Sequence, residues 1–305
     1  MSGFVVVGDA TLDVTVAPSR PVRFGGDVQA VIRVGPGGQG ANVAVRLARR
    51  GERVTLVAPI AADAGGRLLN DALTADGVDV AAMAATPRTA VVVALLDAGG
   101  ERSMLSDRQP IDADQVARVR DGAGWIHVSA YALLDDGNGD VLAGVLGDRA
   151  SSTRLSLAGG SIPPEPAVVA RFLGRAARVR PDMMVVSREE AAALLGSPSD
   201  TAGDATGRLA DRATVVVVTD GSAGSAAAVG GAILEVAAPD LLQPTLDSTG
   251  AGDAYVAALV SRLAAGTWLP AEEALRAAME EGSRAGALVS RVVGAQARVA
   301  GEGNR

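Results

Sequence analysis

The chain has 305 residues, of which 48% are apolar and only 2% aromatic, and its formal net charge is −7. It lacks cysteine and has one histidine, His127, which excludes disulfides, thiolate chemistry and multi-histidine metal sites. All 28 residues counted as lysine or arginine are arginines, so no lysine can clamp a phosphate or complete a Walker A loop. The acidic balance without a basic run argues against nucleic acid as a partner.

The first third of the chain predicts a mixture of helices and separate strand pairs. In chain order we expect a strand at 4–7, strands at 12–16 and 28–34, a helix at 41–50, a strand at 54–58, a helix at 64–75, and strands at 90–96 and 102–105. The strand pairs within 12–34 and 90–105 do not fit an alternation of strands and helices. We expect them to form a small β-rich flap on a single domain that spans residues 1–305.

From residue 125 onwards, strands and helices alternate regularly. In chain order we expect a strand at 125–129, a helix at 137–149, strand 154–157, helix 165–174, strand 183–186, helices 189–195 and 206–212, strand 215–219, a hairpin of 226–229 and 233–236, and helices 251–264 and 271–288. Continuous apolar strands that alternate with helices indicate a parallel sheet covered by helices on both faces.

The beginning of the chain and its hydropathy pattern predict a cytoplasmic location. The first residues, Met1 to Gly3, lead directly into the first strand without a signal peptide. No apolar run reaches the ~20 residues that are needed to span a membrane. We therefore expect no membrane partner.

The segment from Asp247 to Asp253 places a glycine-rich turn directly before an apolar helical run. Backbone N–H groups of Gly250, Ala251 and Gly252 would point into the same space as the unsatisfied donors of the first helical turn. The helix dipole adds partial positive charge there, so the turn suits a phosphate or a developing anion. Asp253 adds a proton acceptor, and an anion site beside a base is what phosphoryl transfer to a hydroxyl requires.

A second glycine cluster, from Gly35 to Asn42, matches the dinucleotide pattern G-x-G-x-x-G through Gly35, Gly37 and Gly40. A strand and a flap precede it, however, and the following strand at 54–58 has no acidic residue at its end for a ribose. The alternatives are a polyol site, where Asn42 donates and accepts hydrogen bonds, and an ordinary turn with Asn42 facing solvent. Asp13 could likewise accept bonds from two sugar hydroxyls or lie in a surface turn.

Four segments resemble, in order and spacing, the ribokinase-like (PfkB) carbohydrate kinases over nearly the whole chain. Residues 37–42 (Gly-Gly-Gln-Gly-Ala-Asn) are similar to the N-terminal signature of that family, and residues 247–253 to its C-terminal signature. Residues 219–224 resemble the nucleotide loop, and residues 294–296 resemble a short pattern near the C-terminus. The resemblance implies a three-layer α/β/α sandwich with a mostly parallel central sheet and a small β-sheet lid, formed here by about 12–34 and 90–105.

The resemblance also implies roles by position. Asp253 would be the general base, and the N–H groups of Gly250, Ala251 and Gly252 would form the anion hole. The remaining implied residues fall into three groups: Asp13, Gly37, Gly38 and Asn42 for the sugar, Thr219, Gly221 and Gly224 for ATP, and Asp247 for a monovalent-cation loop, as in members activated by potassium.

One segment departs from the pattern of the family. Its motif N-x-x-E carries a glutamate that acts through water on magnesium and phosphate; here Glu190 holds the acidic position but Ser187 replaces the asparagine. Glu190 is therefore the candidate beside magnesium and the nucleotide. Two arginines, Arg102 and Arg108, flank the last strand of the expected lid. Either they are solvated, or one contacts a carboxylate or phosphate on the substrate.

The resemblance implies an ATP- and Mg²⁺-dependent sugar kinase, with a ribose-like acceptor favoured. A 2-keto-3-deoxygluconate kinase, in which Arg108 meets a carboxylate, and a nucleoside or pseudouridine kinase are the alternatives. Two rivals from other classes are a non-catalytic nucleotide- or sugar-binding regulator on the same fold and a Rossmann oxidoreductase. Members of the family often form dimers through the lid, and the strand at 90–96 is apolar enough to pair with another copy.

Overall fold

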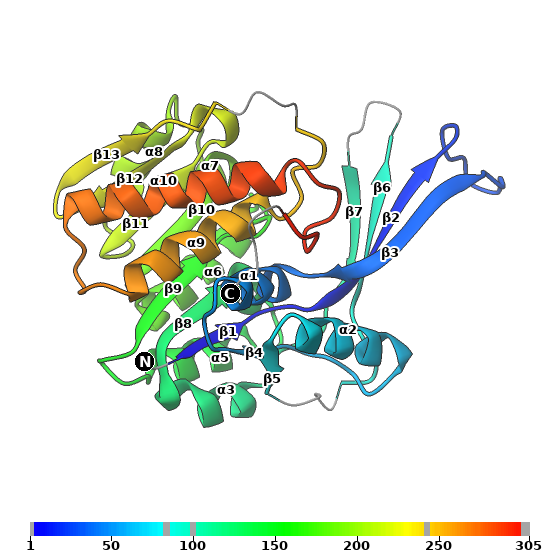
Figure 1. Ribbon diagram of the computed structural model, residues 1–305, viewed down its shortest axis with the longest axis horizontal. Coiled ribbons are helices and arrows are strands. Elements are labelled where there is room, and N and C mark those ends of the chain that lie inside the picture. The colour runs from blue at the N-terminus through cyan, green and yellow to red at the C-terminus, as the bar shows by residue number, and fades with distance from the viewer. Residues whose placement is uncertain (1–2, 82–85, 98–101, 241–244, 300–305) are drawn as a thin grey trace.

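The computed structural model describes residues 3–81, 86–97, 102–240 and 245–299, and their strands form a large and a small sheet (Figure 1). The strands of the large sheet are β1 (Gly3–Val7), β4 (Val54–Val57), β5 (Val78–Val80), β8 (Ala123–Ser129), β9 (Arg154–Ala158), β10 (Met183–Ser187), β11 (Val215–Thr219), β12 (Ser225–Val229) and β13 (Ala232–Val236). Their order is β13-β12-β11-β10-β9-β8-β1-β4-β5. All neighbours from β11 to β5 are parallel, and only β12 and β13 run antiparallel at one edge.

Helices cover both faces of the large sheet. One face carries α1 (Gln39–Arg49), α2 (Ala64–Ala75), α9 (Ala251–Ala264) and α10 (Glu272–Val289). The other carries α3 (Ala113–Val119), α4 (Ala130–Leu134), α5 (Gly139–Gly147), α6 (Pro166–Val179), α7 (Arg188–Leu195) and α8 (Ala202–Leu209). In the described part of the chain, no helix has both the length and the apolar character to cross a membrane.

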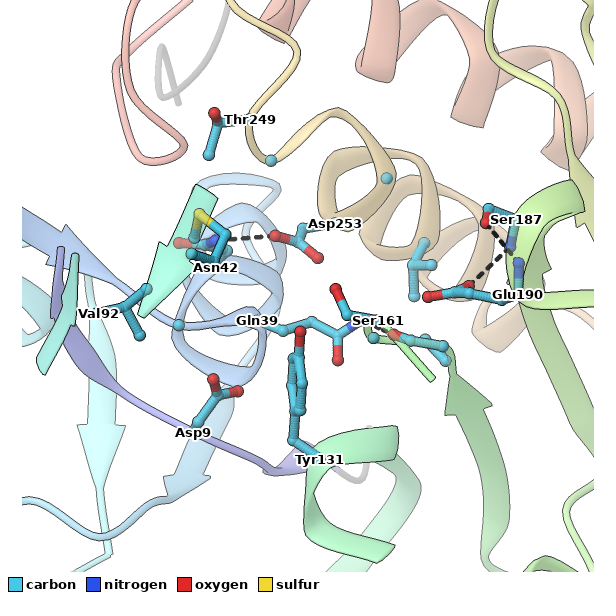
Figure 2. A pocket seen from close by; sticks show the side chains of 18 of the residues that line it. Asp9, Gln39, Asn42, Val92, Tyr131, Ser161, Ser187, Glu190, Thr249 and Asp253 are labelled. Carbon is cyan, nitrogen blue, oxygen red and sulfur yellow. Dashed lines mark hydrogen bonds between the residues drawn. The ribbon is translucent and has the colours of Figure 1, made fainter. Parts of the chain in front are cut away.

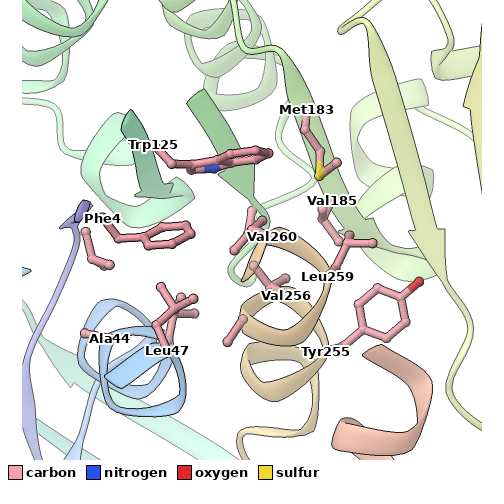
Figure 3. Close-up of a cluster of buried hydrophobic side chains, with 14 of the residues drawn as sticks. Phe4, Ala44, Leu47, Trp125, Met183, Val185, Tyr255, Val256, Leu259 and Val260 are labelled. Carbon is pink, nitrogen blue, oxygen red and sulfur yellow. The ribbon is translucent and has the colours of Figure 1, made fainter. Parts of the chain in front are cut away.

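The two faces of the sheet are both apolar because successive side chains of a strand point in opposite directions. In β1, Val6 belongs to the core under α1 and α9, whereas Val5 and Val7 belong to the core under α3 to α6. Figure 3 shows the first core, in which Leu47 of α1 and Val260 of α9 pack against the sheet. Valine, alanine and leucine fill most of it, as the low aromatic content requires.

The small sheet projects from one side of this body (Figure 1). Its strands are β2 (Thr11–Pro18), β3 (Ala30–Gly37), β6 (Val91–Leu96) and β7 (Arg102–Asp107), in the order β3-β2-β6-β7. Asp63 anchors its base: the carboxylate caps α2 through Gly66 N–H at 2.7 Å and accepts Thr89 N–H at 2.9 Å, just before β6. The small sheet is therefore attached to the body at one end and extends away from it at the other.

The two faces of the small sheet differ. The inner face, which includes Asp13, Val92 and Met104, borders a cavity between the two sheets. The outer face is a row of aliphatic side chains paired across the strands: Val14, Val16, Ile32, Val34, Val93, Leu95 and Leu105. Three of these side chains are strongly exposed, Ile32 at 60%, Val34 at 59% and Leu105 at 63%. Such a face is unusual in a sheet that contacts only water.

The predicted three-layer architecture, with a large mostly parallel sheet and a small sheet, is confirmed. The elements that the sequence did not predict are short: β5, α3 and α4 have 3, 7 and 5 residues. Hydrophobic periodicity needs a window of about 11 residues or more, so elements of this length give no readable period.

Candidate active site

Two adjoining cavities lie at the carboxyl end of the parallel strands, where open α/β sheets bind their ligands. The first cavity, of about 620 Å³, lies between the large sheet and the inner face of the small sheet. The second cavity, of about 740 Å³, lies between β11 and the helices α9 and α10. Three residues line both of them, Thr219, Ser248 and Gly252. The two cavities therefore meet at the N-terminus of α9.

The turn before α9 has a conformation that only glycine allows. Gly250 is the N-cap with φ 79°, and a Cβ at that position would lie 2.8 Å from Cα of Ala295. The N–H of Ala251 donates to Ser248 O at 3.2 Å and closes the turn, whereas Gly252 lines both cavities. The structure thus brings the three predicted anion-hole residues to the junction, with the N–H of Ala251 already engaged within the turn.

Asp253 lies in the first turn of α9, at the boundary between the cavities. Its Oδ2 accepts a hydrogen bond from Asn42 Nδ2 at 2.8 Å (Figure 2). Burial is the main cause that raises the pKa of Asp253, and the charges of Asp9 and Glu190 add to it, whereas the Asn42 hydrogen bond and Arg46 lower it; the net result is a pKa of about 7. A carboxyl group that titrates near neutral pH is well matched to act as a general base.

The predicted sugar residues Asp13, Gly37 and Gly38 meet at the base of the small sheet. A Cβ on Gly37 would lie 2.1 Å from Asp13 Oδ2, so only glycine leaves room for this carboxylate. Gly38 has φ 94°, and a Cβ there would lie 2.7 Å from Asp9 O. Thr11 Oγ1 donates to Asp13 at 2.6 Å, and burial raises the pKa of Asp13.

The structure adds cavity residues that the sequence analysis missed: Asp9, Gln39, Tyr131 and Ser161. Asp9 lies two residues after the end of β1, and its Oδ2 lies 3.3 Å from Nε of Arg108. The guanidinium of Arg108 lies 3.6 Å from the centre of the Tyr131 ring. Three of the four follow a parallel strand at its carboxyl end, Asp9 after β1, Tyr131 after β8 and Ser161 after β9. That position was the signal that could have found them.

The two predicted lid arginines have different positions. Arg108 lines the first cavity, as expected. Arg102 begins β7 opposite Leu96, two residues before Met104, which lines the first cavity. The substrate contact of Arg102 stays a prediction.

Glu190 lines the first cavity, but it also has a structural task. Ser187 is the N-cap of α7, where its Oγ accepts Glu190 N–H at 3.1 Å and its N–H donates to Glu190 Oε2 at 2.8 Å. This pair is a capping box, which explains why serine is suitable at the position where the family pattern has asparagine. Burial raises the pKa of Glu190.

The second cavity combines the predicted nucleotide residues with small side chains. Thr219, Gly221 and Gly224 all line it, around a short 3₁₀ turn after β11. Gly224 has φ 106°, and a Cβ there would lie 2.2 Å from Val236 O. Arg291 is the cation of this cavity, and within the described residues its Nε is buried without a hydrogen-bond partner.

Asp247 organises the turn before α9 rather than facing outward. Its Oδ1 accepts Thr249 N–H at 2.9 Å and Thr249 Oγ1 at 2.6 Å, and its Oδ2 accepts Gly294 N–H at 2.9 Å. The carboxylate thus connects the turn to the segment around residue 294. This is the arrangement expected of a residue that shapes a loop.

The glycine cluster at 35–42 does not form a dinucleotide-binding turn. Its strand, β3, is an edge strand of the small sheet, where it pairs antiparallel with β2, and does not belong to the large parallel sheet. A Cβ on Gly40 would lie 2.7 Å from Cα of Gly8. A dinucleotide fingerprint requires the glycines to follow a strand of a parallel βαβ unit. The interpretation as a Rossmann oxidoreductase is therefore not supported by the fold.

Comparison with known proteins agrees with this geometry. The family model described as pfkB family carbohydrate kinase matches residues 1–300. A fructokinase of Salmonella typhimurium is 30% identical over 301 residues, which cover 95% of this chain and 94% of that protein. A ribokinase from Thermotoga maritima shares the fold, with a TM-score of 0.78, 18% identity, and coverage of 97% of this chain and 95% of that chain.

A fructokinase from Vibrio cholerae was solved with fructose, ADP and calcium; its TM-score is 0.78 at 26% identity, covering 97% of this chain and 95% of that chain. A double mutant of it was solved with fructose, ADP and potassium, with a TM-score of 0.77, 25% identity and coverage of 97% and 94%. The chain belongs to the pfkB family of carbohydrate kinases, and it is a sugar phosphotransferase.

Proposed function

We propose that this sugar kinase is a fructokinase, which transfers the γ-phosphoryl group of ATP to a primary hydroxyl of D-fructose. Fructose replaces the ribose-like acceptor that the sequence favoured. The observation that carries the proposal is the relationship to fructokinases, including one that binds fructose and ADP on the same fold. In this chain the first cavity would hold the sugar and the second the nucleotide.

The charges around the first cavity favour a neutral sugar. The guanidinium of Arg108 already has a carboxylate partner, Asp9, at 3.3 Å. Further carboxyl groups, Asp13, Glu190 and Asp253, line the same space. A sugar acid such as 2-keto-3-deoxygluconate, or a phosphorylated sugar, would add negative charge to a site that is already rich in it. The ring of Tyr131 is covered by Arg108, which leaves little surface for stacking a nucleobase.

In the proposed reaction, Asp253 takes the proton of the acceptor hydroxyl as its oxygen attacks the γ-phosphorus. A bond forms between the sugar oxygen and phosphorus, the bond from phosphorus to the β–γ bridging oxygen breaks, and ADP leaves. The N–H groups of Gly250 and Gly252, which lie at the junction of the cavities, would stabilise the charge of the transferring phosphoryl group. Asn42 holds the carboxylate of Asp253 through the 2.8 Å hydrogen bond.

Without lysine, the charge of the phosphates must be balanced by backbone N–H groups, Arg291 and cations. In the described residues no cluster of three or more His, Asp and Glu side chains forms a metal cage. This fits Mg²⁺, which usually arrives with phosphates and keeps several waters, one of which Glu190 could hold. When bound, Mg²⁺ would offset the negative charge of the phosphates. The carbonyl groups of the turn that Asp247 organises are the proposed site for K⁺.

We further propose that the small sheet acts as a lid. Its inner face contributes Asp13, Val92 and Met104 to the cavity wall. Closure of this wall would remove water, which otherwise competes with the sugar as acceptor and hydrolyses ATP.

The outer face of the lid is proposed to pair with the lid of a second copy. Ile32, Val34 and Leu105 are each exposed by more than half although they lie on one flat aliphatic face. A two-fold dimer brings the same patch of both copies together, so a self-complementary aliphatic face suits it. The partners of the chain would then be its sugar, ATP and another copy of itself.

A coupled assay of ADP release tests the choice of acceptor. The panel contains fructose, ribose, 2-keto-3-deoxygluconate, nucleosides and no acceptor, each with ATP–Mg²⁺, with and without potassium. We expect fructose to have the highest kcat/KM. A higher value for ribose would contradict the choice of sugar. ADP release that no acceptor stimulates would contradict the kinase and favour a nucleotide-binding regulator.

A further inference from the structure

The segment of residues 294–297 is held against one face of α1. Asn42, Arg46 and Arg49 are spaced by four and three residues, so they lie on the same side of that helix. Arg46, which is only 2% exposed, donates through Nη2 to Ala295 O at 2.6 Å and to the carbonyl of residue 297 at 3.0 Å. Arg49 Nη2 donates to the carbonyl of residue 296 at 2.8 Å. Two arginines thus fix the backbone of this segment.

The same segment also contacts the turn before α9. Gly294 N–H donates to Asp247 Oδ2 at 2.9 Å, and Ala295 packs so closely on Gly250 that no Cβ would fit between them. The segment therefore bridges α1 and α9, the two helices that carry Asn42 and Asp253. Its backbone has little freedom to move relative to either of them.

Between these fixed points runs a chain of two amide hydrogen bonds. Gln296 Nε2 donates to Asn42 Oδ1 at 3.0 Å, and Asn42 Nδ2 donates to Asp253 Oδ2 at 2.8 Å. An amide has one acceptor end and one donor end. Because Gln296 binds the oxygen of Asn42, the NH₂ group of Asn42 must face Asp253. Asn42 is 5% exposed, so little water is at hand to replace either partner.

We propose that Gln296 is a positioning residue for the catalytic base, acting through Asn42. Gln296 is not among the described residues that line either cavity. It orients the amide of Asn42, which in turn holds the carboxylate of Asp253. The inference rests on the proposed function, because it needs Asp253 to be the base. It assigns a role to the short pattern at 294–296, which sequence comparison alone left without one.

If Gln296 orients Asn42, its loss should change the acid limb of the kcat–pH profile, which reports the pKa of Asp253. The Asn42 hydrogen bond lowers the pKa of Asp253, against burial, which raises it. The charged groups that act on Asp253 are Asp9 and Glu190, which raise its pKa, and Arg46, which lowers it. A neutral substitution at residue 296 leaves those charges in place. Loss of the orienting bond should therefore raise the pKa of the acid limb and lower kcat together.

The test is a double-mutant cycle on the intact enzyme with fructose and ATP–Mg²⁺. Gln296→Met keeps the length of the side chain but cannot donate a hydrogen bond, and Asn42→Ala removes the amide. We expect Gln296→Met to lower kcat by about tenfold, the upper end of the scale for one hydrogen bond between neutral groups, with the KM for ATP unchanged. In the Asn42→Ala background the same substitution should change kcat less than twofold, because the route is already broken.

Gln29→Met is the matched control, since Gln29 is exposed in the small sheet region far from Asp253, and it should leave kcat and the acid limb unchanged. Effects of Gln296→Met and Asn42→Ala that multiply, or an acid limb that stays in place, would overturn the inference. Asp253→Asn is measured in parallel. If that variant is inactive while Gln296→Met is normal, only the inference fails; if Asp253→Asn is active, the proposed function itself fails.

Discussion

The two cavities that meet at Gly252 are built on different principles. The first is lined by ionisable and amide side chains from several distant segments, among them Asp9, Asn42 and Arg108. The second is lined mainly by glycine, alanine and serine, with Arg291 as its cation. Backbone N–H groups and small residues suit a polyphosphate, which every kinase of this kind binds. Side-chain hydrogen bonds suit the hydroxyl pattern that distinguishes one sugar from another.

The largest loss of activity is expected from a substitution of Asp253, which lies at the boundary between the two cavities. Asp253→Asn should lower kcat by at least ~10²-fold, because the proton of the attacking hydroxyl loses its acceptor. Steady-state ADP release with saturating fructose measures it. The fold should be retained, since Asn keeps the size of the side chain. Activity close to that of the wild type would remove Asp253 from its assigned role.

The pH dependence of thermal stability in the same variant, Asp253→Asn, should reveal that the carboxyl group of Asp253 is buried. The pKa of Asp253 is raised to about 7 in the folded state, against ~3.9 in the unfolded chain. The charged form is therefore disfavoured on folding, and wild-type stability falls as the pH rises from the unfolded value to about 7. Asp253→Asn removes this loss, so its Tm relative to wild type should be higher at pH 8 than at pH 4. An equal difference at both pH values would contradict the burial of this charge.

A pair of glycine substitutions sharpens the role of the phosphate turn. Gly250→Ala should lower the Tm by about 5 °C and kcat by roughly tenfold, because alanine resists positive φ and its Cβ would meet Ala295. Gly207→Ala, in the exposed part of α8 with open space around it, should raise the Tm slightly. Thermal unfolding and ADP release are measured on both. If the two variants behave alike, the turn has no special conformation.

Two arginines allow the cavities to be separated kinetically. Arg291→Ala should raise the KM for ATP by roughly tenfold and leave the KM for fructose unchanged, because a cation beside the phosphates is lost. Arg108→Ala should instead raise the KM for fructose and leave the KM for ATP unchanged, since it leaves Asp9 without its partner in the first cavity. Initial rates over a grid of both substrates give the four constants. A change in the KM for ATP in both variants would mean that the two cavities are not separate subsites.

The smallest effect on turnover is expected from the outer face of the small sheet. Val34→Glu should convert a dimer to a monomer, because it places a charge in an aliphatic face. Ile233→Glu, at an exposed position on β13, is the control and should not change the mass. Light scattering after size-exclusion chromatography measures the molecular mass in solution. A wild-type monomer would contradict the proposed pairing.

The sequence predicted the half of the site that lies in contiguous segments. Asp247 to Asp253 and Thr219 to Gly224 combine a strand end, a turn and glycines within a few residues, so their local geometry can be read directly. Asp9 and Tyr131 follow strand ends that the sequence also shows, but which strand ends border the same cavity depends on which strands are neighbours, and that is not encoded locally. The role of Gln296 depends on its loop lying against α1, which is not encoded locally either. For Glu190 the sequence showed the acidic position but not the capping box with Ser187, because a cap depends on where the helix begins.

The central claim is that the two cavities together move a phosphoryl group from ATP to a sugar and not to water. Phosphorus NMR of a reaction with ATP–Mg²⁺ and fructose tests it in one measurement. We predict equal amounts of ADP and a fructose phosphomonoester, with little inorganic phosphate. Inorganic phosphate in place of the monoester, or no turnover of ATP, would contradict the account.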